Sequence, residues 1–130
     1  MLTGGCHCGE VRYRMPEEVI HCSFCHCVDC RRHAGAPVVA WAGVKAGDLE
    51  IEGTPNEYRS SADTIRSFCG RCGTGLFYVN EIVLPGMIDV QIATLDEPET
   101  LAPAMHVQVA ERLSWMKAGQ VLPEFERYPE

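Results

Sequence analysis

Two short stretches, Cys6-His7-Cys8 and Cys69-Gly70-Arg71-Cys72, are separated by 60 residues and decide how this chain must fold. Each spacing places two sulfurs within reach of one tetrahedral zinc ion, at about 2.3 Å from the metal. Together the two pairs supply four thiolates, which is a closed structural ligand set. Structural zinc is worth about 10–16 kcal/mol in small peptides. We therefore expect Cys6, Cys8, Cys69 and Cys72 to tie the N-terminal strand to the middle of the chain.

A third stretch, Cys25-His26-Cys27-Val28-Asp29-Cys30, supplies three thiolates from one short loop. Three protein ligands leave one position on zinc open, and an open position is where substrate binds. Three thiolates on a divalent ion give a net charge of −1, which makes a soft thiol the more natural fourth ligand. The sequence thus predicts two zinc ions per chain, the second in a catalytic role on Cys25, Cys27 and Cys30.

Cys22 leaves the nature of this second site open. If Cys22 completes a four-cysteine set, the protein is a noncatalytic, zinc-stabilised binding module. If it points away, it is a small buried side chain on the preceding strand, which we favour because three ligands already lie in one loop. The C-x-x-C spacings of Cys22/Cys25 and Cys27/Cys30 also permit thiol redox chemistry, but no βαβ pattern accompanies them.

Composition sets broad limits on the class of protein. The chain has 130 residues, 46% hydrophobic and 22% charged, which is typical of one ordinary globular domain, expected over 1–130. A formal net charge of −7, with no basic run longer than Arg31-Arg32, argues against a nucleic-acid partner. We see no secretory signal, and the longest apolar stretch, 36–44, is too short to span a membrane. We expect a cytoplasmic protein whose cysteines bind metal rather than form disulfides.

Short runs of β-branched and aromatic residues between turn signals predict a single, mostly β domain of short antiparallel strands. The expected strands cover 10–14, 38–44, 49–51, 56–59, 64–68, 75–79, 82–89 and 105–110. One helix is expected over 28–34, with Gly35 as its stop. A further helical turn is expected over either 100–102 or 114–118.

Several other side chains are candidates for roles near the metal loop. His7 and His26 lie between ligands, His33 follows the loop, and His106 fits a hydrogen-bonded structural histidine better than a base. Arg31 and Arg32 are expected to favour the thiolate form of the loop cysteines. Together with Arg71 they either bind a substrate carboxylate or balance the thiolate charge. Trp41, Phe77 and Trp115 either wall a pocket or pack in the core.

The cysteine motifs in their flanking sequence resemble one known family. The matching blocks are Gly4-Gly5-Cys6-His7-Cys8-Gly9, the stretch Cys25-His26-Cys27-Val28-Asp29-Cys30-Arg31-Arg32 followed by Gly35, and Phe68-Cys69-Gly70-Arg71-Cys72-Gly73-Thr74-Gly75-Leu76-Phe77. Leu95-Asp96-Glu97-Pro98, His106 and Trp115 also match the C-terminal part. The chain resembles the glutathione-dependent formaldehyde-activating enzymes, a family that includes centromere-protein-V-like members.

This resemblance implies a β-tent fold with two zinc ions. It implies a structural zinc on Cys6, Cys8, Cys69 and Cys72 and a catalytic zinc on Cys25, Cys27 and Cys30. The implied activity is that of a carbon–sulfur lyase, which interconverts S-hydroxymethylglutathione with formaldehyde and glutathione. The implied partner is therefore a small thiol such as glutathione.

Overall fold

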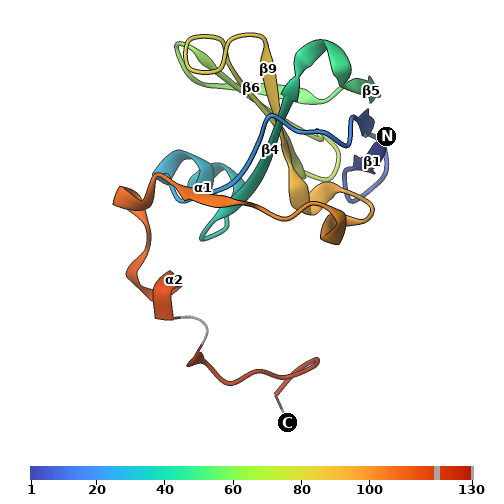
Figure 1. Ribbon diagram of the computed structural model, residues 1–130. Helices are drawn as coiled ribbons and strands as arrows, with labels where there is room; N and C mark the ends of the chain where they lie inside the picture. Colours follow the sequence, from blue (N-terminus) through green and yellow to red (C-terminus); the bar gives the residue numbers. More distant parts are fainter. Residues whose placement is uncertain (119–120, 130) are drawn as a thin grey trace.

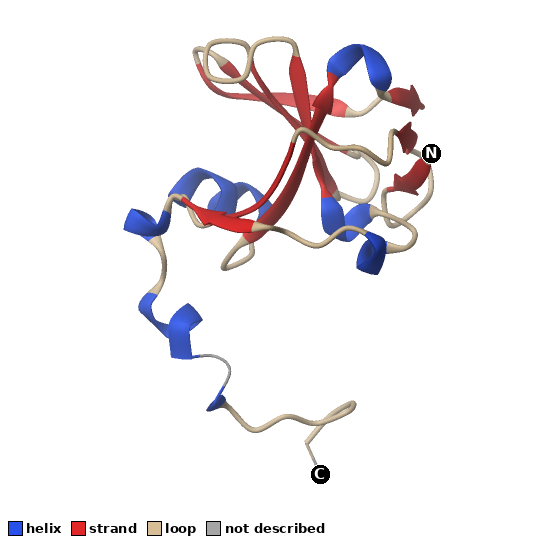
Figure 2. Ribbon diagram, in the orientation of Figure 1, coloured by secondary structure: helices blue, strands red, loops and turns tan. Residues whose placement is uncertain are grey.

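The structure, a computed structural model, describes residues 1–118 and 121–129 and consists of two β-sheets with short helices beside them, while the last helix lies in the C-terminal stretch that leads away from the sheets (Figures 1 and 2). A three-stranded sheet has the order β1-β2-β5, with β1 Leu2–Gly5, β2 Arg12–Met15 and β5 Glu50–Glu52. A seven-stranded sheet has the order β10-β3-β4-β9-β8-β7-β6. Its strands are β3 His21–Cys25, β4 Val39–Lys45, β6 Asn56–Ser61, β7 Thr64–Phe68, β8 Gly75–Asn80, β9 Met87–Gln91 and β10 Met105–Val107. The predicted mostly β fold is confirmed.

Most of the large sheet is antiparallel, but its outermost pair is parallel. β10 lies beside β3 with Met105 opposite Ser23 and Val107 opposite Cys25. Parallel neighbours need a long connection. After β3 the chain forms all the remaining strands of this sheet before it forms β10. The end of the domain is therefore brought back beside its early cysteine loop (Figure 1).

Two strands lie outside the ranges predicted from sequence, and two predicted strands are shorter than expected. β1 and β3 fall outside those ranges, because β1 contains two glycines and β3 overlaps the cysteine-rich loop. The prediction of a strand over 82–89 is wrong in its first half. There the Asn80 side chain accepts hydrogen bonds from the N–H groups of Ile82 and Val83, which turns the chain before β9 begins.

The strand predicted over 105–110 ends early for a backbone reason. Gln108 adopts a left-handed conformation with φ of 58°, which ends the extended backbone, and a 3₁₀ turn follows over Val109–Glu111. Further 3₁₀ turns cover Ala46–Asp48, Ile92–Thr94 and Pro98–Thr100.

Helix α1 (Val28–Ala34) has the bounds that the sequence predicted. The side chain of Cys27 caps its first turn by accepting the N–H of Cys30. Gly35 ends it in the left-handed conformation, with φ of 67°, and returns its N–H to Arg31 O. Helix α2 (Ser114–Ala118) matches one of the two ranges expected for a further helical turn. No helix within the described ranges is both long and apolar enough to cross a membrane.

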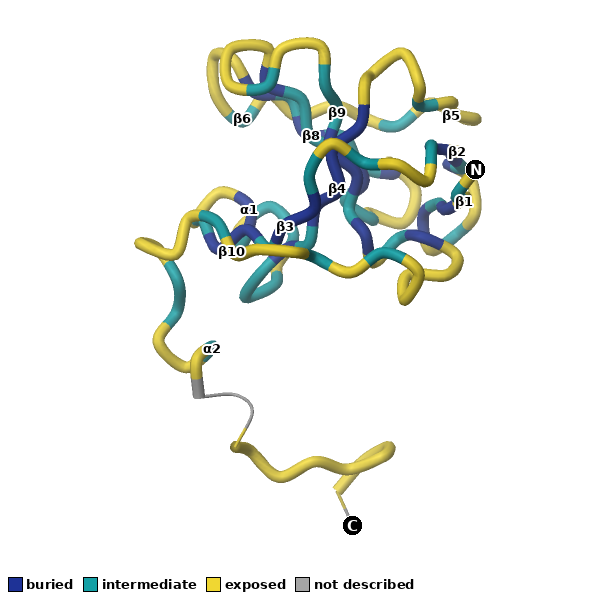
Figure 3. Tube along the Cα trace, in the orientation of Figure 1, coloured by how far each residue is buried: buried dark blue, intermediate teal, exposed yellow. Residues whose placement is uncertain are grey.

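The main core lies between the two sheets (Figure 3). Tyr13 and Met15 of β2 are fully buried there against a face of the large sheet, and the rings of Tyr13 and Phe77 meet edge to face at 5.4 Å. On that face the paired residues Cys22, Ala42, Val90 and Phe77 form one row across β3, β4, β9 and β8. On the opposite face of the large sheet, a second cluster of buried side chains contains Cys25, Cys30, Val39 and Trp41.

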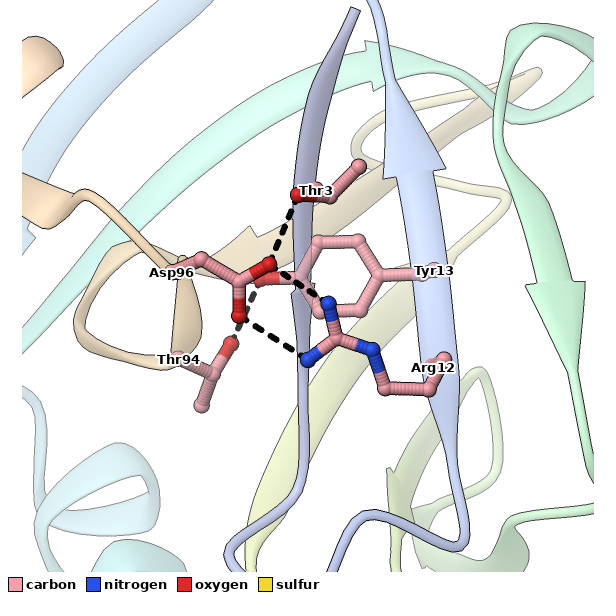
Figure 4. Close-up of polar contacts among 5 residues, drawn as sticks. All are labelled: Thr3, Arg12, Tyr13, Thr94 and Asp96. Carbon is pink, nitrogen blue, oxygen red and sulfur yellow. Dashed lines mark hydrogen bonds and ion pairs between the residues drawn. The ribbon is translucent and has the colours of Figure 1, made fainter.

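A polar cluster holds the loop after β9 against the small sheet (Figure 4). The guanidinium of Arg12 donates to both carboxylate oxygens of Asp96, and the Thr3 hydroxyl adds a third hydrogen bond of 2.6 Å. Arg12 lowers the pKa of Asp96 to about 2. Beneath this pair, the Tyr13 hydroxyl bonds to Thr94 over 2.7 Å. The loop and the small sheet are thus fixed by charge at the surface and by a neutral hydrogen bond below it.

Replacing Asp96→Asn should lower the free energy of unfolding by about 1 kcal/mol, since the pair is two-pronged but partly exposed. Chemical denaturation at neutral pH measures this change. Asp63→Asn, in the exposed turn between β6 and β7, is the matched control. Equal stability of Asp96→Asn and the control would contradict the assigned role of the ion pair.

Candidate functional site

The two terminal cysteine pairs meet at one point. Cys6 and Cys8 lie in the turn after β1, Cys69 and Cys72 lie in the turn between β7 and β8, and all four sulfurs are within 4.8 Å of one another. The Sγ atoms of Cys6 and Cys8 are 3.6 Å apart, and those of Cys8 and Cys69 are 3.7 Å apart. Four sulfurs at zinc–sulfur distance on a tetrahedron would be about 3.8 Å apart, and a disulfide would need about 2.0 Å. This donor set fits a tetrahedral zinc ion.

Hydrogen-bond donors surround these sulfurs. The backbone N–H of Val11 donates to Cys6 Sγ over 3.2 Å, and that of Arg71 donates to Cys69 Sγ over 3.4 Å. A contact of 3.2 Å with the Thr74 hydroxyl is the main cause that lowers the pKa of Cys72 to about 5. Donors aimed at sulfur stabilise the thiolate, which is the form that binds metal.

The three cysteines of the middle loop form a second group, again with all sulfurs within 4.8 Å. Cys25 ends β3, Cys27 caps α1, and Cys30 lies in the first turn of that helix. The hydrogen bond from Cys25, followed by that from Arg66, lowers the pKa of Cys30 to about 5. Both cysteine sets can hold a metal ion, and their all-sulfur composition suits zinc. That they are zinc ligands stays a prediction.

Arg66 is a functional candidate that sequence reasoning missed. It is only 4% exposed, and its guanidinium donates to Cys30 Sγ over 3.5 Å and to the Ser60 hydroxyl over 3.2 Å. Its guanidinium carbon also lies 5.0 Å from the ring centre of Tyr78. Within the described residues it forms no ion pair with a carboxylate. Its charge therefore faces the thiolates, and it would cancel the net −1 of three thiolates on zinc.

Arg31, one of the arginines expected from sequence, does not fill this role. Arg31 donates instead to the backbone carbonyls of His26 and Glu111, which anchors α1 to the chain after β10. Arg66 belongs to β7, 36 residues from Cys30 in sequence, so proximity along the chain could not reveal it.

Cys22 points away from the middle loop. Its thiol donates to the carbonyl oxygen of Ala102 over 3.2 Å, and its side chain packs in the main core between the sheets. Because neighbouring residues of a strand face opposite sides, Cys22 and Ser23 lie on different faces of β3. The buried role favoured from the sequence is confirmed, and the middle set remains one of three cysteines.

The histidines take structural positions, with one exception. His26 and His106 share a hydrogen bond of 2.8 Å, and Phe24 stacks on His106, as expected for a structural histidine. His33 stacks on Tyr58, and His7 is exposed. The exception is His21, which sequence reasoning did not consider. Its Nε2 lies 2.9 Å from Oδ1 of buried Asp89.

A cavity of about 330 Å³ opens beside the three cysteines. Trp41 and Tyr78 form its aromatic wall, whereas Phe77 is in the core and Trp115 is 59% exposed.

A signal for His21 was present in the sequence, because His21, Ser23 and Cys25 are spaced two residues apart and therefore lie on one face of a strand. The residues that line the cavity are His21, Ser23, Cys25, Cys27, Cys30, Trp41, Tyr78, Val83, Leu84, Asp89, Met105, Val107 and Gln108.

One family model matches most of the chain, and relatives and a solved structure are similar to it. The family model described as glutathione-dependent formaldehyde-activating enzyme matches residues 1–111. An uncharacterized lyase of Schizosaccharomyces pombe is 26% identical over 110 residues, covering 74% of this chain and 80% of the relative. A Halomonas elongata protein provisionally named a glutathione-dependent formaldehyde-activating enzyme is 26% identical over 129 residues, covering 90% and 80%. A crystal structure of a Rhodobacter sphaeroides protein superposes with a TM-score of 0.66 at 23% identity, covering 82% of this chain and all of that one, and supports the fold.

The two cysteine sets should differ in what they do for the fold. We expect two zinc ions per wild-type chain, and one in a folded Cys27→Ser variant, measured by elemental analysis after gel filtration. Cys69→Ser should lose cooperative folding, because its site joins distant strands. Two zinc ions per chain in Cys27→Ser would contradict the prediction that Cys25, Cys27 and Cys30 bind the second ion.

Arg66→Met should weaken zinc binding at the middle set by about 10- to 100-fold, the usual cost of losing a hydrogen-bonding partner of a metal ligand. Competition with a chromogenic chelator measures both sites separately. The control is Arg59→Met on β6, whose guanidinium bonds only to the carbonyl of Ala62 among the described residues. If both variants bound zinc at the middle set with equal affinity, Arg66 would not stabilise the charge of that site.

Proposed function

Because the chain belongs to the family of glutathione-dependent formaldehyde-activating enzymes, we propose that it is a zinc-dependent carbon–sulfur lyase acting on a thiol–aldehyde adduct. The substrate class is S-hydroxymethylglutathione or a close analogue, and the partner is a small thiol such as glutathione. Cys6, Cys8, Cys69 and Cys72 hold a structural zinc in this proposal. Cys25, Cys27 and Cys30 hold the catalytic one.

The observation that carries the proposal is the position of the three-cysteine set in the wall of a cavity. Cys25, Cys27 and Cys30 all line the 330 Å³ space, and Cys22, the residue that would close the set, lies in the core. The four-cysteine set would fill all four positions around a tetrahedral zinc ion and leave none for a substrate. A space of this size suits a small molecule, and an all-sulfur ligand set suits a thiol as its next ligand.

The residues around the set can perform the chemistry of the adduct. Zinc bound by the three cysteines would keep the substrate sulfur as a thiolate at neutral pH. The buried guanidinium of Arg66 offsets the negative charge that such a thiolate adds. Trp41 and Tyr78 exclude water from one wall, which strengthens these electrostatic interactions. On cleavage, the carbon–sulfur electron pair leaves with sulfur, and the adduct hydroxyl loses its proton as the aldehyde forms.

Two other functions lose support. A noncatalytic binding module was favoured only if Cys22 completed the middle set, and its thiol bonds to Ala102 instead. Redox exchange between Cys22 and Cys25 would need a disulfide between side chains on opposite faces of one strand. The Cys27/Cys30 pair lies at a helix start, but that helix follows an antiparallel strand rather than a βαβ crossover.

Wild-type protein with zinc should accelerate the exchange between S-hydroxymethylglutathione and free formaldehyde plus glutathione, as measured by ¹³C exchange NMR. Cys27→Ser should lower this rate by more than about 100-fold, because losing a ligand costs more than losing one of its hydrogen-bonding partners. Cys22→Ser is the matched control. Its hydroxyl can still donate to Ala102, and its rate should stay close to wild type.

Metal content and circular dichroism are measured on each protein, so that loss of rate is separated from loss of fold. Unchanged exchange in a folded Cys27→Ser would refute the catalytic role of the three-cysteine set. A rate equal to that of buffer in wild type with two zinc ions would refute the lyase proposal.

A further inference from the structure

Half-buried His21 and buried Asp89 form a pair in the wall of the cavity, on strands that are not neighbours. β3 carries His21, β9 carries Asp89, and β4 lies between them. The two residues face the same side because both belong to one cross-strand row, in which His21 pairs with Gly43 and Gly43 pairs with Asp89. Their hydrogen bond of 2.9 Å therefore passes over the intervening strand.

Gly43 makes this contact possible. A Cβ atom placed on Gly43 would clash with the ring of His21 and would lie 2.8 Å from Oδ1 of Asp89. Glycine in the interior of a strand lowers stability and often marks a place where another group must approach the backbone closely. Here the group that approaches is the imidazole of His21.

The hydrogen bond with His21 offsets part of the free-energy cost of burying the Asp89 carboxylate. Asp89 is 5% exposed, and an unpaired buried carboxylate is strongly unfavourable. Burial raises the pKa of Asp89, and the contact with His21 opposes that rise. The side chain of His21 keeps 24% of its surface exposed, so its ring is anchored at one nitrogen and accessible elsewhere.

The hydrogen bond fixes the tautomer of His21. A carboxylate can only accept, so the Nε2–H of His21 donates to Asp89 and Nδ1 keeps its lone pair. An aspartate that holds one imidazole nitrogen and leaves the other free orients the ring for proton transfer. His21, Ser23 and Cys25 alternate along β3, so the side chain of His21 belongs to the same cavity wall as the three-cysteine set.

The cysteines and His21 belong to the lining of one cavity of about 330 Å³. Four residues of strand separate the Cα atoms of His21 and Cys25 by about 13 Å. A small adduct that fills this cavity would meet both the cysteines and His21, because all of them line it.

We propose that His21 is the proton-transfer residue of the lyase, positioned by Asp89 across Gly43, an inference that rests on the proposed function. In cleavage, Nδ1 of His21 accepts the proton of the adduct hydroxyl while the oxygen forms the carbonyl and the carbon–sulfur electron pair leaves with sulfur. In synthesis, the thiolate sulfur forms the bond to the carbonyl carbon, and the imidazolium returns the proton to the resulting alkoxide. Atoms and electrons balance in both directions without a further reactant.

Three variants separate this role from a structural one. His21→Gln keeps a donor for Asp89 but cannot carry a proton, Asp89→Asn removes the carboxylate, and Gly43→Ala keeps both side chains while separating them. The control is His7→Gln, an exposed histidine in the turn after β1. The probe is ¹³C-labelled formaldehyde with glutathione, and the readouts are kcat, KM, zinc content and melting temperature.

We expect His21→Gln to lower kcat by about 10²- to 10⁴-fold, the usual contribution of a general acid or base. Glutathione affinity, measured by the sulfur-to-cobalt absorption band of cobalt-loaded protein, should not change. Asp89→Asn and Gly43→Ala should give smaller losses of kcat. In ¹⁵N NMR, neutral His21 should be the Nε2–H tautomer in wild type and should lose that preference in both positioning variants.

The outcomes distinguish this inference from the function on which it rests. A normal kcat in His21→Gln would overturn the role of His21 and leave the lyase proposal intact. A parallel fall of rate, zinc content and melting temperature in all three variants would mean a structural pair and would also overturn it. Absence of wild-type exchange above the buffer rate would overturn both.

Discussion

The antiparallel pairing of β3 with β4 is the constraint on which the site depends. It sets Cys22 opposite Ala42 on the core face and His21 opposite Gly43 on the cavity face. A slip of one residue would exchange these faces, sending the cysteine of the core into the cavity and the histidine into the core. The packing of Cys22 against the small sheet and the hydrogen bond of its thiol to Ala102 both hold this register.

The two cysteine sets, each able to hold a metal ion, differ in their place in the fold. The terminal set joins the turn after β1 to the turn between β7 and β8, and backbone N–H groups point at its sulfurs. With the proposed structural zinc it would join the two sheets rigidly. The middle set lies instead at the start of a short helix and in a cavity wall, where one side is available to a ligand.

Charge on the cavity face is arranged in a line across the sheet. Paired residues place His21, Asp89, Tyr78 and Arg66 in one row, with a cation near the thiols and a carboxylate on the histidine. Each buried charge has a partner of opposite sign, which limits the cost of taking it out of water. The row joins the part of the cavity that we propose binds the substrate sulfur to the part that we propose moves a proton.

The sequence by itself determined the two terminal cysteine pairs, the middle cysteine loop, the mostly β fold and the bounds of α1, because these depend on local spacing, whereas only the folded chain brings the two terminal pairs together. C-x-C and C-x-x-C pairs place sulfurs together whatever surrounds them, and a cysteine cap and a glycine stop define a helix within ten residues. Only the tertiary structure decided the direction of Cys22, the partner of the thiolates and the His21–Asp89 pair. Arg66 and Asp89 reach the site from strands β7 and β9, through sheet order and register, and those pairings have no local signature in the chain.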